Sequence, residues 1–279
     1  MTTVNVASHL ARMAALDPDA PAIHFPTRGG SFARTFSQLN ADVDALAHGL
    51  TASGISRGVR VALMVPPSPE FFALTFALFK VAAVPVFIDP GMGIRNLGVC
   101  LGEAEPTAFV GIAKAHLARR IFGWAKASIR TTVNVGRRRF FCRHSTRELS
   151  DIGMSRGPFA SPEVSSDEPA AILFTSGSTG IAKGAEYTHG IFSTQVEMLK
   201  ATYGIEPGEI DFCTFPLFAL FGPALGMTCV IPEMDFSRPA TINPWKAADT
   251  IRKFEVTNFF GSPAVITRFG DLSVNAVPF

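Results

Sequence analysis

The 279-residue chain has little charge and few cysteines. Charged residues make up 17% of it, below the roughly 25% of ordinary soluble domains, and hydrophobic residues make up 47%. This composition excludes a disordered chain, a coiled coil and a collagen-like fibre, and the net charge of +2 gives no case for nucleic-acid binding. The cysteines are far apart and form no CxxC pair, which argues against a zinc cluster or a disulfide framework and favours reduced thiols. They are Cys100, Cys142, Cys213 and Cys229.

The chain also lacks a long uncharged hydrophobic run. Residues 1–20 show no basic segment followed by an apolar core, so we expect no signal peptide. The most apolar stretch, 71–88, contains Lys80 and Pro85, whereas a membrane-spanning helix needs about 20 largely uncharged residues. We therefore expect a cytoplasmic protein, with peripheral association with the inner membrane left open.

Helical and strand-like segments alternate along the first half of the chain. Apolar residues recur with a helical period over 35–50 and 70–81, while short β-branched or apolar runs at 59–65, 84–88 and 108–112 predict strands. Strands that alternate with helices of about a dozen residues imply parallel βαβ units. The predicted fold class is α/β, with βαβ subdomains and mainly parallel sheets.

Two later stretches stand out by composition. Residues 114–147 hold ten Lys or Arg and no Asp or Glu, which indicates an anionic partner such as a membrane surface or an acidic protein. The alternative interpretation is a solvated helical face followed by a loop. Residues 150–168 are rich in Ser, Pro, Gly and acids, so we expect a break between subdomains there.

A loop rich in glycine and hydroxyl groups directly follows a short apolar strand at 170–174. The loop, 175–184, contains Lys183 near its end. Glycines allow backbone N–H groups to turn onto an anion, hydroxyls donate hydrogen bonds, and a lysine adds positive charge. The pattern predicts a nucleotide phosphate site, with an ordinary flexible turn as the alternative.

Two other functional motifs, the Walker A loop and the hydrolase nucleophile elbow, do not fit the sequence. In a Walker A loop starting at Gly177, the second glycine would fall on Ala182. Residues 153–157 match the letters of a hydrolase nucleophile elbow, but no buried strand precedes them, so we interpret this as a chance match.

The stretch 175–184 resembles the phosphate-binding signature of the acyl-adenylate-forming superfamily, which includes acyl-CoA synthetases, peptide-synthetase adenylation domains and insect luciferases. Further core motifs occur in the family's order between about residues 5 and 268. They are 35–39, 79–90, the Tyr187-Thr188-His189 triplet and 214–222. The last of these, with Ala219 where many members have His, and residues 258–263 look most like the branch of long-chain olefin synthesis. That branch activates β-hydroxy fatty acids and closes them to β-lactones.

The resemblance implies a mechanism and a set of residues. A fatty carboxylate would attack the α-phosphate of Mg·ATP, and a thiol such as CoA or a carrier protein, or the substrate's own hydroxyl, would then displace AMP. Thr175 and Lys183 would be catalytic, with Thr175 also a ligand of Mg²⁺. His189 would lie near the nucleotide or start a helix. The phosphates would be held by Thr175, Ser176, Gly177, Ser178, Thr179, Gly180, Lys183 and Gly184.

Phenylalanine dominates the aromatic residues, with 25 Phe against 2 Tyr and 2 Trp. Four of them recur every three residues over 212–221, and a dry aromatic wall of this kind suits an alkyl chain. Core packing is the alternative for each. The predicted substrate pocket consists of Phe215, Phe218, Phe221, Phe260, Gly261 and Ser262.

Members of the resembled family are about twice as long as this chain. We therefore expect 1–279 to be a partial large domain that lacks the later nucleotide motifs and the small C-terminal domain, and that adenylates no acid alone. A non-catalytic remnant or a binding subunit of a lipid-enzyme assembly stays open as the alternative. For its partners, a homo-oligomer or a lipid-enzyme complex stays open.

Overall fold

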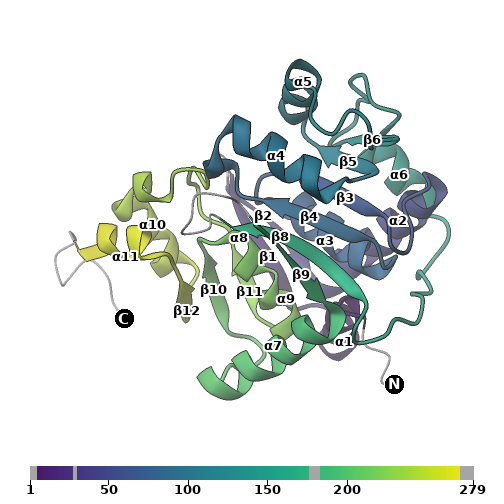
Figure 1. The fold of residues 1–279 in the computed structure, drawn as a ribbon. Helices are drawn as coiled ribbons and strands as arrows, with labels where there is room; N and C mark the ends of the chain where they lie inside the picture. The colour runs from purple at the N-terminus through teal and green to yellow at the C-terminus, as the bar shows by residue number, and fades with distance from the viewer. Residues whose placement is uncertain (1–4, 28–29, 176–182, 271–279) are drawn as a thin grey trace. The chain divides into compact units, whose positions relative to one another are not determined.

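The computed structural model of the chain describes residues 5–27, 30–175 and 183–270 (Figure 1). The chain forms two compact units. Unit 1 comprises Met1–Ser8, Asn40–Pro66 and Glu70–Gln195, and unit 2 comprises His9–Leu39, Pro67–Pro69 and Val196–Phe279.

Unit 1 is built on a seven-stranded sheet with the order β7-β6-β5-β3-β4-β8-β9. Every neighbouring pair is parallel except β8 and β9, which are antiparallel. The strands are β3 (Arg60–Met64), β4 (Val84–Ile88), β5 (Ala108–Gly111), β6 (Thr131–Asn134), β7 (His144–Ser145), β8 (Pro169–Thr175) and β9 (Lys183–Thr188). The helices between them are α3 (Pro69–Lys80), η1 (Pro90–Met92), α4 (Ile94–Ala104), α5 (Ala113–Phe122) and α6 (Thr146–Gly153).

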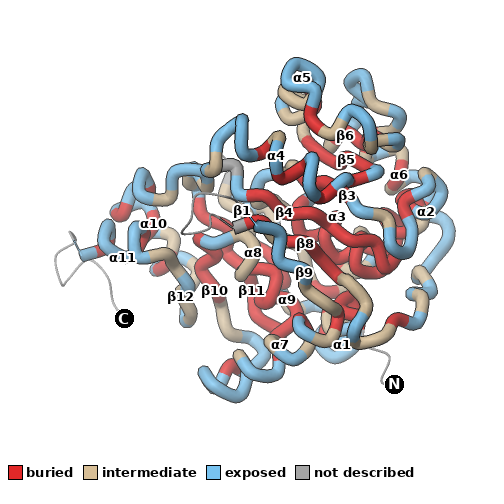
Figure 2. Tube along the Cα trace, in the orientation of Figure 1, coloured by how far each residue is buried: buried red, intermediate tan, exposed pale blue. Residues whose placement is uncertain are grey.

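The apolar stretch 71–88 forms the interior of unit 1. Helix α3 begins with a proline and has Glu70 in its first turn and Lys80 in its last, charges that complement the helix dipole. All its residues from Phe71 to Lys80 are buried, as is all of β4, and Figure 2 shows α3 in red. The predicted helix over 70–81 and strand over 84–88 are confirmed. None of the helices among the described residues is long and apolar enough to cross a membrane.

Helix α4 lies along one face of this sheet (Figure 1) and contributes Leu97, Cys100 and Leu101 to a core that also contains Val86 and Phe109. These residues come from two strands and the crossover helix between them, which is the βαβ arrangement predicted from the sequence. The α/β class with mainly parallel sheets is confirmed.

The subdomain break expected near 150–168 lies inside unit 1. The segment after α6 leads into β8, which pairs with β4 through Phe87↔Leu173 and so belongs to the same sheet. One of the boundaries between the two units falls between Gln195 and Val196, within α7 (His189–Tyr203).

Unit 2 contains a five-stranded sheet with the order β12-β10-β11-β1-β2. Its central pairing joins distant parts of the chain, because Ile23 of β1 lies opposite Cys229 of β11 in a parallel ladder. The strands are β1 (Pro21–Thr27), β2 (Gly30–Thr35), β10 (Ile210–Cys213), β11 (Thr228–Val230) and β12 (Asn258–Phe260). The remaining helices are α1 (Ala7–Leu16), α2 (Phe36–Ala52), α8 (Pro216–Ala219), α9 (Phe221–Leu225), η2 (Pro239–Thr241), α10 (Pro244–Lys253) and α11 (Pro263–Gly270), of which α1 and α2 have residues in both units.

Candidate functional site

The two ends of the glycine-rich loop are held side by side in unit 1. Thr175 is the last residue of β8 and Lys183 the first of β9, and the two are partners in the antiparallel register. Such partners lie about 5 Å apart between Cα atoms. The loop is therefore a closed connection whose two ends are fixed by the sheet. The predicted phosphate ligands Ser176, Gly177, Ser178, Thr179 and Gly180 lie outside the described residues.

The loop leaves the sheet at the edge where ligands bind in open α/β folds. Ile88, the last residue of β4, lies opposite Phe174 in the parallel pairing with β8. The motif over 79–90 therefore ends beside the motif over 175–184, at the carboxyl ends of adjacent parallel strands. Two sequence motifs almost a hundred residues apart meet at one place.

Lys183 is exposed and forms no ion pair with a carboxylate within the described part of the chain. An exposed ammonium group at the end of the loop fits an anionic ligand. Gly184 has a packing reason as well, because a Cβ there would come within 2.9 Å of Cζ of Phe174.

His189 is the first residue of α7 and its side chain is fully buried. Its Nδ1 accepts a hydrogen bond from the backbone N–H of Val6 at 3.2 Å. Burial lowers the pKa of His189 to about 4, with Glu168 raising it and Arg57 lowering it to smaller extents. His189 was expected either to lie near the nucleotide or to start a helix. Its position as the first residue of α7 supports the second of these roles.

Residues 153–157 do not form a nucleophile elbow. Gly153 is the last residue of α6, so a helix rather than a strand precedes Ser155, which is exposed. The glycine at 153 is required by packing, because a Cβ would lie 2.1 Å from the carbonyl oxygen of Ala45.

Four of the predicted pocket residues form one aromatic cluster in unit 2. Phe218 and Phe260 are stacked with their ring centroids 3.7 Å apart, and Phe215 and Phe221 lie 6.3 Å from Phe260 and 5.5 Å from Phe218 respectively. Phe215 and Phe260 are 46% and 44% exposed, whereas Phe221 is 9% exposed. The cluster therefore has an open side made by two rings and a buried side made by Phe221.

The aromatic cluster lies at the carboxyl ends of two parallel strands. Cys213 of β10 is the partner of Phe260 of β12, and the hydroxyl of Thr214 donates to the carbonyl oxygen of Phe260 at 2.8 Å. Nearby in the chain, Ser262 has a buried Oγ without a hydrogen-bond partner among the described residues. Gly261 packs against Phe259, whose ring would be 2.9 Å from an added Cβ.

The regular spacing of phenylalanines does not place all of them on one surface. Phe212 is fully buried and, with Phe259, belongs to the core of unit 2. The chain changes from β10 to α8 after Phe212, so residues three apart turn to different sides. Core packing, the alternative interpretation, is therefore right for Phe212.

Sequence reasoning did not single out Asp211, a buried carboxylate with a strongly shifted pKa. It lies on β10, is 7% exposed and has its Oδ2 3.2 Å from Sγ of Cys213. Burial raises the pKa of Asp211 to about 6, and hydrogen bonds from Cys213 and the backbone of Phe260 oppose the rise. The one feature of the sequence that could have indicated Asp211 is that an acidic residue lies within a short apolar strand.

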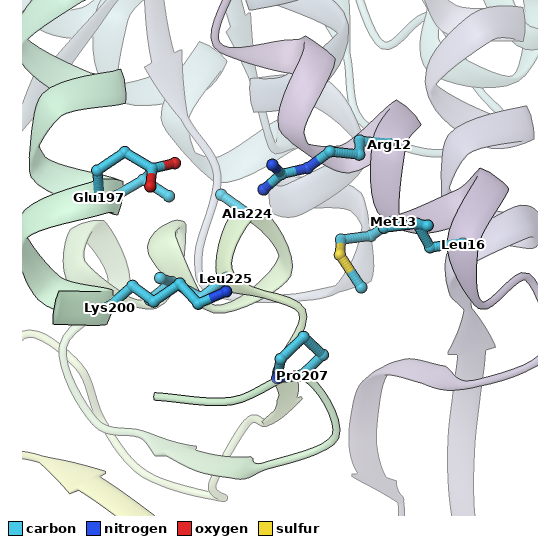
Figure 3. A pocket seen from close by; sticks show the side chains of 9 residues that line it. Arg12, Met13, Leu16, Glu197, Lys200, Pro207, Ala224 and Leu225 are labelled. Atoms are coloured by element: carbon cyan, nitrogen blue, oxygen red, sulfur yellow. The ribbon is translucent and has the colours of Figure 1, made fainter. Parts of the chain in front are cut away.

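A small pocket of about 120 Å³ is lined by residues of unit 2. Figure 3 shows Arg12 and Met13 of α1 on one side, with Glu197 and Lys200 of α7 on the other. Pockets for ligands of drug size measure roughly 300–1,000 Å³, so this one is too small for an acyl chain or a nucleotide.

A family model described as AMP-binding enzyme matches residues 10–278. The chain belongs to the AMP-binding enzyme family. It is 47% identical over 270 residues to olefin beta-lactone synthetase of Stenotrophomonas maltophilia (strain K279a), an alignment that covers 94% of this chain and 49% of the relative. It is 46% identical to the protein of the same name from Xanthomonas campestris pv. campestris, with 97% and 50% covered. The chain thus spans about half the length of these relatives.

Solved structures share the fold. A putative long-chain-fatty-acid CoA ligase from Rhodopseudomonas palustris superposes with a TM-score of 0.80 at 21% identity, covering 98% of this chain and 67% of that one. ATP-bound MatB from the same species gives 0.75 at 21% identity, covering 95% and 51%. The resemblance to the adenylate-forming fold predicted from the sequence motifs is confirmed.

Proposed function

We propose that this chain supplies the phosphate-binding loop and part of the acyl site of an ATP-dependent ligase. The ligase would activate a long-chain β-hydroxy fatty acid as its acyl-adenylate and close it to a β-lactone. The observation that carries the proposal is the pairing of Thr175 with Lys183, which fixes both ends of the loop beside the end of β4. The 46–47% identity with two proteins named olefin beta-lactone synthetase favours this substrate class.

The described residues fit a nucleotide at the loop. In the first step the acid's carboxylate oxygen bonds to the α-phosphorus and the bond to pyrophosphate breaks, so negative charge grows on the leaving group. Lys183 would offset that charge, and residues 176–180 together with Gly184 would hold the phosphates. Thr175 would be a ligand of Mg²⁺, which screens the same phosphates. Catalysis of this kind depends on positioning and charge more than on a covalent protein nucleophile.

The second step distinguishes the possible acceptors. In β-lactone closure the substrate's own β-hydroxyl oxygen bonds to the acyl carbon, AMP leaves with the bonding electrons, and the hydroxyl proton passes to solvent. In the alternative the thiol of CoA or a carrier protein attacks the same carbon. A proposed aromatic wall of Phe215, Phe218 and Phe260 would hold the alkyl chain in either reaction.

The proposal is tested with residues 1–270 of this chain joined to the remaining half of the Stenotrophomonas relative, alongside the 279-residue chain itself. The chimera is expected to show ATP–pyrophosphate exchange that depends on a β-hydroxy fatty acid, and to release a β-lactone without added CoA. Lys183→Ala and Thr175→Ala should each slow exchange at least tenfold, equal to about 1.4 kcal/mol of barrier. Lys246→Ala, which removes an exposed lysine of α10, is the matched control.

Three results would contradict the proposal. Exchange that is unchanged in both loop variants would remove the loop from the mechanism. Release of acyl-CoA as the only product would replace β-lactone closure by transfer to a thiol. A folded chimera without any acid-dependent exchange would favour a binding subunit or non-catalytic remnant.

A further inference from the structure

The surface formed by α5 and the loop between β6 and β7 combines exposed arginines with exposed apolar side chains. We call it the Arg–Phe surface, and define it as Arg120, Ile121 and Phe122 of α5 together with loop residues 137–143. Figure 2 shows α5 and the loop beside β6 mostly in pale blue. The surface belongs to unit 1 and shares no residue with the phosphate loop or the aromatic cluster.

Apolar side chains are unusually open to solvent on the Arg–Phe surface. Phe141 is 82% exposed and Phe140 51%, while Ile121 and Phe122 of α5 are 67% and 49% exposed. The guanidinium carbon of Arg120 lies 5.2 Å from the centroid of the Phe141 ring, so helix and loop form one surface. Several exposed apolar residues gathered in one place mark an interaction site more often than isolated ones do.

Hydrogen bonds hold the loop in this conformation. The side-chain amide of Asn134 donates to the carbonyl oxygen of Arg138 at 2.8 Å. The backbone N–H of Cys142 donates to the carbonyl oxygen of Arg139 at 2.9 Å. Phe140 and Phe141 have φ angles of 48° and 63°, a left-handed conformation that bulky residues rarely adopt. Such strain persists only where the surroundings enforce it, and it often marks a functional segment. The fold thus presents two phenylalanines at the tip of a fixed loop.

The positive charge of this region is mostly unneutralised. The stretch 114–147 has ten Lys or Arg and no Asp or Glu. Within the described part of the chain, only Arg139 and Arg147 of these form ion pairs with carboxylates, namely Glu148 and Asp151. The charge of this surface therefore favours an anionic partner.

The combination of rings and charges favours a lipid surface. Guanidinium groups bind the phosphates of anionic headgroups, while aromatic side chains enter the boundary between headgroups and acyl chains. An acidic protein would engage the arginines, but it would need its own pockets for two neighbouring phenylalanines. We propose that the Arg–Phe surface binds membranes that contain anionic phospholipids, with Phe140 and Phe141 inserted at the interface. This inference does not rest on the proposed function.

The test uses the 279-residue chain and sedimentation with vesicles of phosphatidylcholine, with or without phosphatidylglycerol. Binding is expected only with phosphatidylglycerol, and it should weaken as salt rises. Arg137→Gln with Arg138→Gln, and separately Phe140→Ser with Phe141→Ser, should each weaken partitioning roughly tenfold or more. The matched controls, Arg95→Gln with Arg156→Gln and Met154→Ser, remove exposed charge and apolar area elsewhere in unit 1 and should bind as the parent does.

A fluorescent variant keeps the test decisive if the loop variants fold poorly. Phe141→Trp should shift its emission to the blue on addition of anionic vesicles and be quenched by brominated lipids, relative to the parent chain. Absence of binding, equal binding to neutral vesicles or a lack of quenching in the Phe141→Trp variant would overturn the proposal. Binding to an acidic polypeptide or a nucleic acid in preference to the vesicles would also overturn it, in favour of a macromolecular partner.

Discussion

His189 binds the N-terminal segment of the chain through its ring: Nδ1 accepts the backbone N–H of Val6 at 3.2 Å. A nitrogen that accepts carries no proton, so the neutral ring holds its proton on Nε2, a buried atom with no partner among the described residues. Protonation of Nδ1 would remove this hydrogen bond and place a charge in the interior. The histidine of the Thr-His pair after the glycine-rich loop therefore has a structural role.

The first prediction follows from the pKa of His189, which burial lowers to about 4. An unfolded histidine takes up a proton near pH 6.5, whereas the folded one resists until about pH 4. The contribution of His189 to the free energy of unfolding is therefore complete above pH 6.5 and is lost as the pH falls toward 4, on the order of 3 kcal/mol in all. Urea denaturation of the parent and of His189→Gln at a series of pH values measures the effect.

The difference between the parent and His189→Gln should shrink as the pH falls through this range. His48→Gln is the control, because it removes a histidine whose Nε2 lies 3.2 Å from the carbonyl oxygen of Gly157 and whose ring packs against Phe159. If the free energies of unfolding of the parent and of His189→Gln had parallel pH profiles, the prediction would be wrong, because His189 would then take up its proton at the same pH in the folded and unfolded states.

The helices and strands of unit 1 could be predicted from the sequence where they depend on patterns within a short stretch of chain. Period and run length predicted α3 and β4, and alternation predicted the parallel sheet. The same rules missed β1 and β2, and missed the pairing of β1 with β11, because a partner about two hundred residues away leaves no local pattern. For residues 114–147 these rules predicted a helical face followed by a loop and no strand. Strands β6 and β7 lie in this stretch, but they are too short to produce a recognisable sequence pattern.

A second prediction concerns Asp211, whose pKa burial raises to about 6. The unfolded carboxyl ionises near pH 3.8, whereas the folded one stays protonated until about pH 6. Its favourable contribution is therefore present below pH 3.8 and is lost as the pH rises to 6, an effect on the order of 3 kcal/mol at most. Asp211→Asn should be more stable than the parent above pH 6.

Thermal melting at several pH values measures this difference, which should grow between about pH 4 and pH 6 and then stay constant. Asp249→Asn, which changes an exposed acid of α10, should show no such growth. A melting temperature of Asp211→Asn below that of the parent at neutral pH would mean that the ionised carboxylate is well compensated.

The third prediction concerns the buried ion pair between Lys80 of α3 and Asp44 of α2. Both side chains are under 9% exposed, and Asp44 also accepts the N–H of Phe159 at 2.9 Å and the side-chain amide of Asn40 at 3.2 Å. Lys80→Met leaves a buried carboxylate without its cation, which should cost about 3–5 kcal/mol of stability. Chemical denaturation of the single and double variants measures it.

Adding Asp44→Leu to Lys80→Met should restore part of the loss, since it removes the uncompensated charge. Recovery is incomplete because the N–H of Phe159 then lacks its acceptor. The exposed pair Arg147–Asp151 is the control, and Arg147→Met should cost no more than about 1 kcal/mol. A double variant less stable than Lys80→Met would show that the pair contributes through packing.

The residues predicted for the substrate pocket show most clearly where the expectation from the sequence and the structure differ. A period of three predicted one aromatic wall, but the change from β10 to α8 puts Phe212 in the core and leaves Phe215 half exposed. The contact between Phe218 and Phe260 depends on the pairing of β10 with β12, which no local pattern reports. The phosphate residues could be predicted from the sequence because their motif is contiguous, whereas a pocket wall is assembled from separate segments.

The last prediction separates a substrate role from core packing in the aromatic cluster. Phe260 is 44% exposed and stacks on Phe218, so Phe260→Ala removes ring surface that a ligand could cover while leaving the core intact. In the chimera, Phe260→Ala and Phe218→Ala should change the ratio of kcat/KM between long and short β-hydroxy acids about tenfold, with the KM for ATP unchanged. Phe212→Ala is the control: this fully buried ring should cost about 3–5 kcal/mol of stability and reduce activity toward all acids alike. Equal losses for every acid in Phe260→Ala, with a lowered melting temperature, would assign the exposed rings to packing, because a residue that contacts the alkyl chain must discriminate by its length.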